Sequence, residues 1–283
     1  MIRLFGFLKV AFVIGADFAM IYYAFRSLEI AAICTALIFL YVWLGGYLSL
    51  LKEGAVNAKK IPSYEKNKLD MVRARLVEDV RNTSGVNVSG ISLYLVPDDD
   101  TMNATAYGAN CISVTRGTLN NADPITLNAV LSHEISHILN YDAEFQRAVF
   151  CSVTLLVGAV SIMSAAAMVV IFLIFLVLSC FRSWLGVLAF RGTTKAVGGI
   201  FSLFQRAIVL IYRTVLSLVS RQSEYRCDRY ACQLGYGIQL AHFLSLAEPY
   251  SQRQLTLTEA LYRSHPPTPK RIARLEAQCS GRR

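Results

Sequence analysis

The feature that most constrains this chain is an apolar stretch from Ala148 to Phe181 that contains no charged residue. As one helix it would be about 50 Å long, which exceeds the ~30 Å hydrocarbon core of a bilayer, so it must tilt, protrude or break. Two earlier apolar blocks, from about Leu4 to Phe25 and from about Ile30 to Leu51, each approach the ~20 residues that a spanning helix needs. The hydrophobic fraction is 54%, the charged fraction is 17% and the mean hydropathy is +0.44. The sequence therefore predicts a membrane protein.

The apolar blocks also predict how the chain is divided. Only residues 26–29 separate the first two blocks, so they form a helical hairpin rather than a cleavable signal peptide. Lys9 and Asp17 interrupt the first block and are expected to face the bundle interior or a partner, because ionisable groups rarely face lipid. A fourth block, from Ala196 to Val219, contains arginines and is a weaker candidate for a span. The predicted parts are an N-terminal transmembrane hairpin at 1–52, a polar domain in two pieces at 53–147 and 221–283, and an apolar insert at 148–220 that forms a second hairpin.

The net charge of +9 is concentrated beside an apolar block. A cluster of lysines follows the second block: Lys52, Lys59, Lys60, Lys66 and Lys68. Basic residues gather on the cytoplasmic flank of membrane spans, and anionic lipids attract them there. Topology and the lipid bilayer therefore explain the positive charge, and no nucleic-acid partner is expected.

The seven cysteines are odd in number, widely scattered and form no CxxC pair. Several lie in apolar blocks, where cysteine behaves as a small hydrophobic residue. This pattern does not indicate a disulfide framework, and it is typical of a reducing compartment.

A five-residue motif, from His133 through Glu134 to His137, matches the pattern HExxH. Asp123 and Pro124 form a strong helix start just before it, so the motif is expected on a helix. Residues four apart lie on one helix face, so both imidazoles can bind one zinc ion while Glu134 takes a proton from the attacking water. A chance match is less favoured, because the chain has only four histidines and two of them fall here.

A third ligand would identify the type of metal site. A metzincin needs glycine and histidine at the positions of Asn140 and Ala143, so that class is excluded. A helix that continued from the motif would have to break to bring the next acidic residues back to the metal. A later pair, four residues apart, would project from one face of a second helix, where one could bind zinc and the other could orient a histidine. The candidates are Asp142, Glu144, Glu224 and Asp228.

Several motifs in order carry a family resemblance. They are NATAYG at 103–108, HEISH at 133–137, SRQSEYRCD at 220–228 and SHPPTPKRI at 264–272, with an apolar hairpin in front and an apolar insert in the middle. In this set the chain resembles the HtpX-type membrane zinc metalloproteases, which are related to the prenyl-protein peptidases of the endoplasmic reticulum. The resemblance covers most of the chain. It implies a mainly α membrane protein whose small α+β catalytic domain is zincin-like (gluzincin) and has a short antiparallel sheet, with strands expected at 91–96, 103–108 and 112–115.

The resemblance also implies roles for particular residues. Glu224 would be the third ligand of a single Zn²⁺, and Asp228 would support a ligand histidine. The segment with Asn103, Ala104, Thr105 and Ala106 would be the edge strand that pairs with an extended substrate. His265 could act in catalysis by donating to the oxyanion, although a helix-capping role before two prolines fits equally well. Cys227 stands where the family usually has alanine, and our hypothesis is that its oxidation affects the site.

Topology follows from the positions of the ligands. His133 precedes the third apolar block and Glu224 follows the fourth, so the chain between them crosses the membrane an even number of times if both bind one metal. With the lysine cluster, this puts the zinc site and both termini on the cytoplasmic side.

We therefore expect a zinc metalloendopeptidase, with several spans in the inner (plasma) membrane, that hydrolyses misfolded or membrane-associated proteins on the cytoplasmic side. An intramembrane protease is disfavoured because the motif helix is too polar. The alternative from another class is a non-catalytic membrane scaffold with a structural zinc site. Structural sites tend to be closed by four protein ligands and do not need Glu134.

Overall fold

The computed structural model describes residues 2–108, 110–179, 184–247 and 266–280. Two compact units divide the chain, one made of Met1–Ala148 and Ser217–Arg283 and the other of Val149–Leu216. Among the described residues, four helices are long and apolar enough to cross a membrane. The mainly helical fold that the sequence predicts is confirmed.

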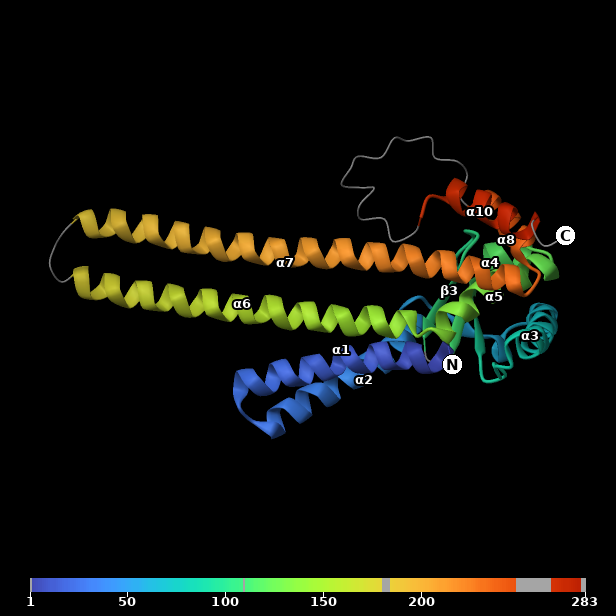
Figure 1. Ribbon diagram of the computed structural model, residues 1–283, viewed down its shortest axis with the longest axis horizontal. Coiled ribbons are helices and arrows are strands. Elements are labelled where there is room, and N and C mark those ends of the chain that lie inside the picture. The colour runs from blue at the N-terminus through green and yellow to red at the C-terminus, as the bar shows by residue number, and fades with distance from the viewer. Residues whose placement is uncertain (1, 109, 180–183, 248–265, 281–283) are drawn as a thin grey trace. The chain divides into compact units, whose positions relative to one another are not determined.

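The N-terminal hairpin consists of α1 (Ile2–Phe25) and α2 (Leu28–Lys52), which pack along each other (Figure 1). Arg26 adopts a left-handed conformation (φ 53°), and the Ser27 hydroxyl accepts a hydrogen bond from the Ile30 N–H at the start of α2. A left-handed residue followed by an N-cap reverses the chain within two positions. Many apolar side chains on both helices are exposed, as expected for surfaces that face lipid.

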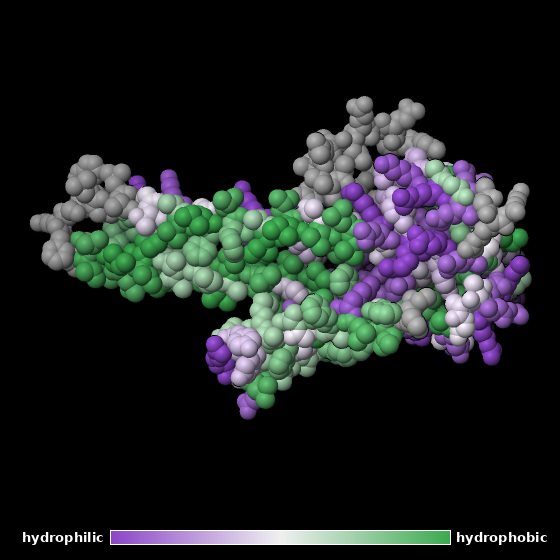
Figure 2. Space-filling view, in the orientation of Figure 1, coloured by the Kyte–Doolittle hydropathy of each residue, from purple (hydrophilic) through white to green (hydrophobic). Residues whose placement is uncertain are grey.

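Two longer helices follow the motif. Helix α6 runs from Asp142 to Ser179 and helix α7 from Trp184 to Gln233. Their span candidates, Asp142–Leu178 and Phe190–Gln233, have mean hydropathies of 2.8 and 1.4. Figure 2 shows hydrophobic residues along these helices and over the hairpin, whereas hydrophilic residues gather around the sheet and the C-terminal helices. Helix α7 continues without interruption from apolar sequence into the stretch that carries Glu224 and Asp228.

The sheet is mixed, which corrects the expected antiparallel sheet. Its strands are β1 (Val56–Asn57), β2 (Ser92–Val96), β3 (Ala104–Gly108) and β4 (Cys111–Thr115), in the order β1-β2-β4-β3. β3 and β4 form an antiparallel hairpin, and β4 inserts beside β2, to which it is parallel. The chain that leaves β2 forms β3 first, one strand away from β2, and then returns as β4 between them. β3 therefore lies at an edge of the sheet.

Helices cover the sheet and form the core of the polar domain. They are α3 (Ser63–Ser84), the short α4 (Arg116–Asn121), α5 (Pro124–Leu139), α8 (Gly237–Ala247) and α10 (Thr268–Ser280), with a 3-10 turn at Ala58–Lys60. Leu69 and Leu76 of α3, Ile112 of β4 and Leu127 and Leu131 of α5 are almost fully buried in one cluster. This packing holds α5 between α3, α8 and the sheet.

Candidate metal centre

Helix α5 presents the two motif imidazoles on one face. The Asp123 carboxylate accepts a 2.6 Å hydrogen bond from the Thr126 N–H, and Pro124 occupies the first helical turn, so the helix begins where the sequence predicts. His133 and His137 lie four residues apart, and their Nε2 atoms are 3.3 Å apart. His133 is only 5% exposed. Two nitrogen donors thus converge at the bottom of a mostly buried site.

The carboxylate of Glu224, on α7, faces both Nε2 atoms, and we call the two nitrogens and this carboxylate the donor triangle. Its Oε2 lies 3.4 Å from His133 Nε2, and its Oε1 lies 3.5 Å from His137 Nε2. Ligands at about 2.1 Å from a tetrahedral zinc ion are spaced about 3.4 Å from one another. The 3.3 Å between the two Nε2 atoms fits this value, and the two Glu224 oxygens lie at similar distances, Oε2 at 3.4 Å from His133 and Oε1 at 3.5 Å from His137. Two imidazoles and one carboxylate are also a donor set that zinc accepts, with a fourth position left for water or substrate.

Each motif histidine has a carboxylate at its other ring nitrogen. Asp228 Oδ1 lies 3.1 Å from His133 Nδ1, and Asp142 Oδ2 lies 2.9 Å from His137 Nδ1. A carboxylate at Nδ1 holds the proton there and leaves the lone pair of Nε2 free for a metal. Both rings therefore face Glu224 through Nε2, the nitrogen that is free to bind a metal ion when the proton is on Nδ1.

Asp142 reaches the site because the helix breaks after Leu139, as the sequence requires if this residue is to return to the metal. Helix α5 ends at Leu139, Tyr141 adopts a left-handed conformation (φ 53°), and α6 starts at Asp142. A Cβ added to Gly6 of α1 would lie 2.7 Å from the Asn140 carbonyl oxygen, so α1 packs closely against this break. Asp142 thus returns toward His137, but at the nitrogen that faces away from the donor triangle.

Two cations neutralise Asp142. Lys9 of α1 donates to its Oδ1 at 2.8 Å, and Arg226 of α7 donates to its Oδ2 at 2.6 Å. The Asp142 side chain is 5% exposed and the Lys9 side chain is 31% exposed. Lys9 therefore faces a partner within the chain, and the first apolar helix is connected to a histidine of the site. A lysine in an apolar block is the one sign of this pairing that the sequence contains.

Arg271 of α10 connects the two acidic residues of α7. Its guanidinium donates to Asp228 at 2.9 and 2.7 Å and lies 2.9 Å from Glu224 Oε2. Its side chain is 8% exposed. A buried arginine compensates two buried carboxylates and fixes their geometry through a bidentate pair. The motif at 264–272 pointed to this region, and the structure brings Arg271 into it, whereas His265 lies outside the described residues.

The acidic side chains around the two imidazoles raise their pKa values in the metal-free protein. Burial lowers the pKa of His133, but Asp228 and Glu224 outweigh burial and raise this pKa to about 10. The pKa of His137 is also raised despite burial, through Cys227, Asp142 and Glu224. A site with this much negative character attracts a cation, and a metal ion must displace protons from these rings.

Glu134 lies beside the donor triangle and contacts the edge strand. Its Oε2 accepts a 2.7 Å hydrogen bond from the Ala106 N–H of β3. Residues Asn103, Ala104, Thr105 and Ala106 line the same cleft as the two histidines, Glu134 and Glu224. An apolar part of the cleft wall is formed by three residues of α8, Leu240, Phe243 and Leu244. The edge strand β3, the Glu134 carboxylate and the donor triangle therefore share one cleft.

Cys227 brings a further donor near the histidines. A nitrogen of His133, a nitrogen of His137 and the Cys227 Sγ all lie within 4.8 Å of one another. The Glu224 oxygens lie 3.4 and 3.5 Å from the Nε2 atoms. The site therefore has two candidates for the third donor, the Glu224 carboxylate and the Cys227 thiol on the next turn of α7. Cys227 is fully buried, which opposes direct attack by an oxidant on its sulfur.

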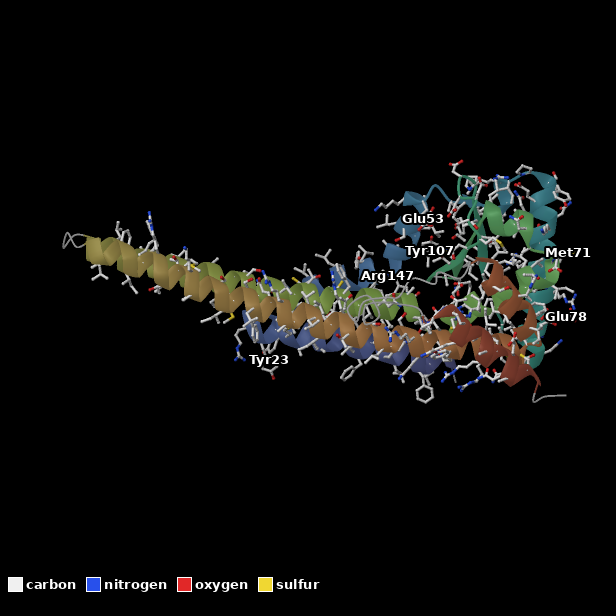
Figure 3. The ribbon with its side chains drawn as sticks, turned by 90° about the horizontal axis from the view of Figure 1, so that it is seen from above. Tyr23, Glu53, Met71, Glu78, Tyr107 and Arg147 are labelled. Atoms are coloured by element: carbon white, nitrogen blue, oxygen red, sulfur yellow. The ribbon has the colours of Figure 1, made fainter. Side chains whose placement is uncertain are left out.

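The N-terminal hairpin also positions the edge strand. A Cβ on Gly46 of α2 would overlap the Tyr107 carbonyl oxygen, so only glycine allows this approach. Arg147 donates to the carbonyl oxygens of Val42 at 2.7 Å and of Tyr107 at 3.0 Å, and the Tyr107 hydroxyl donates to Glu53 (Figure 3). The strand end next to Ala106 is therefore held against α2.

A pair of imidazoles faces a glutamate, and four of the helices that the structure describes are long enough to span a membrane, which is the arrangement of a membrane-bound metallopeptidase. Residues 66–279 match the family model described as Peptidase family M48. The chain belongs to this family. It is a metalloprotease, a hydrolase that acts on polypeptides, and a multi-pass membrane protein in contact with lipid.

The chain is similar to several individual proteins. The chain is 27% identical over 223 residues to a Campylobacter hominis protein named Protease HtpX homolog, covering 69% of this chain and 71% of that protein. It is 31% identical over 202 residues to a Dictyoglomus thermophilum protein of the same name, covering 64% and 61%, and 24% identical over 255 residues to Protease HtpX of Idiomarina loihiensis, covering 84% and 81%. The crystal structure of S. mikatae Ste24p is similar with a TM-score of 0.49 and 18% identity, and the match covers 93% of this chain and 61% of that protein.

Proposed function

We propose that the protein is a zincin-like (gluzincin) endopeptidase that uses one Zn²⁺ held by His133, His137 and Glu224. The observation that carries the proposal is the donor triangle, in which the two Nε2 atoms lie 3.3 Å apart and the two Glu224 oxygens lie 3.4 and 3.5 Å from them, with Glu134 beside it. When bound, zinc supplies Lewis-acid polarisation of the scissile carbonyl and acidifies the attacking water. Three protein ligands leave a position for that chemistry.

The chain's own residues supply the proton transfers and the positioning. Glu134 takes a proton from the attacking water and passes it to the leaving amine. Its present hydrogen bond to the Ala106 N–H keeps the carboxylate at the cleft and next to the substrate strand. Asp228 and Asp142 hold the two rings, and Arg271 holds Glu224 and Asp228.

The substrate class follows from the cleft. We propose that an extended polypeptide adds to the exposed edge of β3, along Asn103, Ala104, Thr105 and Ala106, through main-chain hydrogen bonds. In this mode the strand recognises the main chain of the substrate rather than particular side chains. Unfolded segments of many different sequences can therefore bind. Misfolded and membrane-associated proteins present such segments, and we propose them as the substrates.

The proposed location is the inner membrane, with the catalytic domain facing the cytoplasm. The lysine cluster after α2 supports this orientation through the positive-inside rule. His133 and Glu224 share one site although α6 and most of α7 separate them in sequence, so an even number of crossings lies between them. We propose the domain limits 1–52, 53–147, 148–220 and 221–283 on the same grounds.

A non-catalytic scaffold with a structural zinc site is the second candidate. One observation favours it, namely the Cys227 thiol near both histidines, because a fourth protein ligand would close the site. Glu134 opposes it, since a structural site has no use for a carboxylate beside the metal.

The test compares the detergent-purified, zinc-loaded protein with a Glu134→Gln variant on an unfolded model protein. The expected result is cleavage by the wild type and none by the variant, with equal zinc content in both. Glu78→Gln, on the surface of α3, is the matched control and should cleave like the wild type. If the wild type binds zinc but cleaves no unfolded protein, the scaffold is favoured; if Glu134→Gln cleaves equally, Glu134 is not the base.

A further inference from the structure

Two cysteine thiols outside the metal site meet between α7 and α10. The Sγ atoms of Cys232 and Cys279 lie 3.0 Å apart, although 47 positions separate the residues in the sequence. Cys232 is buried and Cys279 is partly exposed. A disulfide bond is about 2.05 Å long, so the sulfur atoms need to approach by only about 1 Å. The wide spacing of the cysteines along the chain does not predict this pair.

The thiol pair lies at one end of a helix contact whose other end is at the metal site. Along α10, Arg271 contacts Glu224 and Cys279 contacts Cys232. The second contact lies the same number of residues after the first in both helices, at 279 after 271 in α10 and at 232 after 224 in α7. The two helices therefore run in the same direction over this stretch, and a bond between the thiols would hold the helix that carries Arg271.

The start of α8 gives the sulfur atoms their space. A Cβ added to Gly237 would overlap the Sγ atoms of both Cys232 and Cys279. Gly237 is buried and its backbone is helical, so its conformation does not require glycine. The small residue at this position is explained by the space that the two sulfur atoms occupy.

We propose that Cys232 and Cys279 form a site of reversible oxidation, at which a peroxide converts the two thiols into a disulfide that clamps α10 onto α7. The more exposed Cys279 sulfur attacks one peroxide oxygen, the O–O bond breaks, and a sulfenic acid and one water form. The Cys232 sulfur then attacks the sulfenic sulfur, the S–O bond breaks, and a disulfide and a second water form. The two thiols lose two electrons and the peroxide gains them.

The clamp has a consequence for the metal site that rests on the proposed function. Arg271 reaches Glu224 and Asp228 only while α10 is packed on α7. Disulfides suppress opening of the segments that they join, and the usual stabilisation corresponds to a shift on the order of 100-fold in an opening equilibrium. If zinc leaves through such opening, oxidation slows its release by on the order of 10- to 100-fold.

The experiment uses the full-length Glu134→Gln protein, so that self-cleavage does not interfere. The zinc-loaded protein is treated with hydrogen peroxide, its remaining thiols are alkylated, and unreduced peptides are analysed by mass spectrometry. Zinc release to an excess of chelator is timed before and after oxidation. Cys279→Ala removes one partner, and Cys34→Ala, in helix α2, is the matched control.

The proposal expects a Cys232–Cys279 cross-linked peptide that a reductant removes, in the starting protein and in Cys34→Ala but not in Cys279→Ala. Zinc release should slow on oxidation only where the cross-link forms. Irreversible sulfinic or sulfonic acid at Cys279, or pairing with other cysteines, would overturn the proposal. A cross-link without any change in zinc release would overturn the clamp. Failure of the reduced protein to bind zinc would count against the proposed function and leave the cross-linking result valid.

Discussion

Replacing Asp142 by asparagine changes one charge beside His137 while keeping the size of the side chain. In the structure the Asp142 carboxylate accepts from Lys9 at 2.8 Å, from Arg226 at 2.6 Å and faces His137 Nδ1 at 2.9 Å. All three partners are donors when the histidine binds a metal through Nε2. An asparagine has only one oxygen, so its amide nitrogen must face at least one of these donors.

The expected loss of zinc affinity follows from these contacts. Removing a carboxylate that orients a metal-binding histidine typically costs 10- to 100-fold in affinity, about 1.4–2.7 kcal/mol. We expect the upper part of this range, because Lys9 and Arg226 would remain as uncompensated cations near a divalent ion. Lys9→Met should cost less, about tenfold at most, since Arg226 still binds Asp142 and keeps the carboxylate beside His137.

The assay is competition with a chelator of known affinity, in detergent at fixed pH and ionic strength. Asp70→Asn, on the exposed face of α3, is the matched control and should bind zinc like the wild type. In the double variant, Lys9→Met should recover part of the affinity lost in Asp142→Asn, because it removes a cation that no longer has a carboxylate partner. Unchanged affinity in Asp142→Asn, or full additivity with Lys9→Met, would refute this account of how the first helix supports the site.

Three further predictions follow from other contacts. Glu224→Gln should lose most of the bound zinc while Cys227→Ala keeps it, as measured by metal content after dialysis; the opposite result would make the thiol the ligand. Asp123→Ala removes the cap of the motif helix and should lower the free energy of unfolding by about 1 kcal/mol. Its hydrogen bonds with Thr126 lower the pKa of Asp123, so this contribution is present above the unfolded value of about 3.9 and is lost as pH falls through the lower folded pKa; a stability difference that persists at the acid end would contradict it. Gly46→Ala should destabilise the protein by about 1–3 kcal/mol through overlap with Tyr107, whereas Gly15→Ala, which has open space, should not; thermal unfolding in detergent compares the two.

Much of the site follows from sequence because its residues lie on regular helices. The spacing of His133 and His137, and of Glu224 and Asp228, already places each pair on one face. The helix start at Asp123 is also predicted from the sequence, because an N-cap residue and a proline act within the first helical turn. Local rules therefore predict the parts of the site that are formed within single helices.

The remaining features depend on contacts between distant segments. Asp142 reaches His137 only because Tyr141 adopts a left-handed conformation, which a tyrosine rarely does and which sequence does not signal. The mixed sheet depends on which neighbour β4 takes, and the two-residue β1 is too short to leave a pattern. The contact between Lys9 and Asp142, and that between Cys232 and Cys279, are decided by how helices pack.

The central claim is that one zinc ion at the donor triangle is required for hydrolysis. The most direct measurement is a zinc titration of the metal-free protein, with cleavage of an unfolded protein and bound zinc followed together. The account predicts no cleavage without metal, and activity that rises in proportion to bound zinc until one ion per chain is bound. Glu134→Gln should bind the same single ion and remain inactive. Full cleavage by the metal-free protein, or one tightly bound zinc per chain without any activity, would contradict the claim.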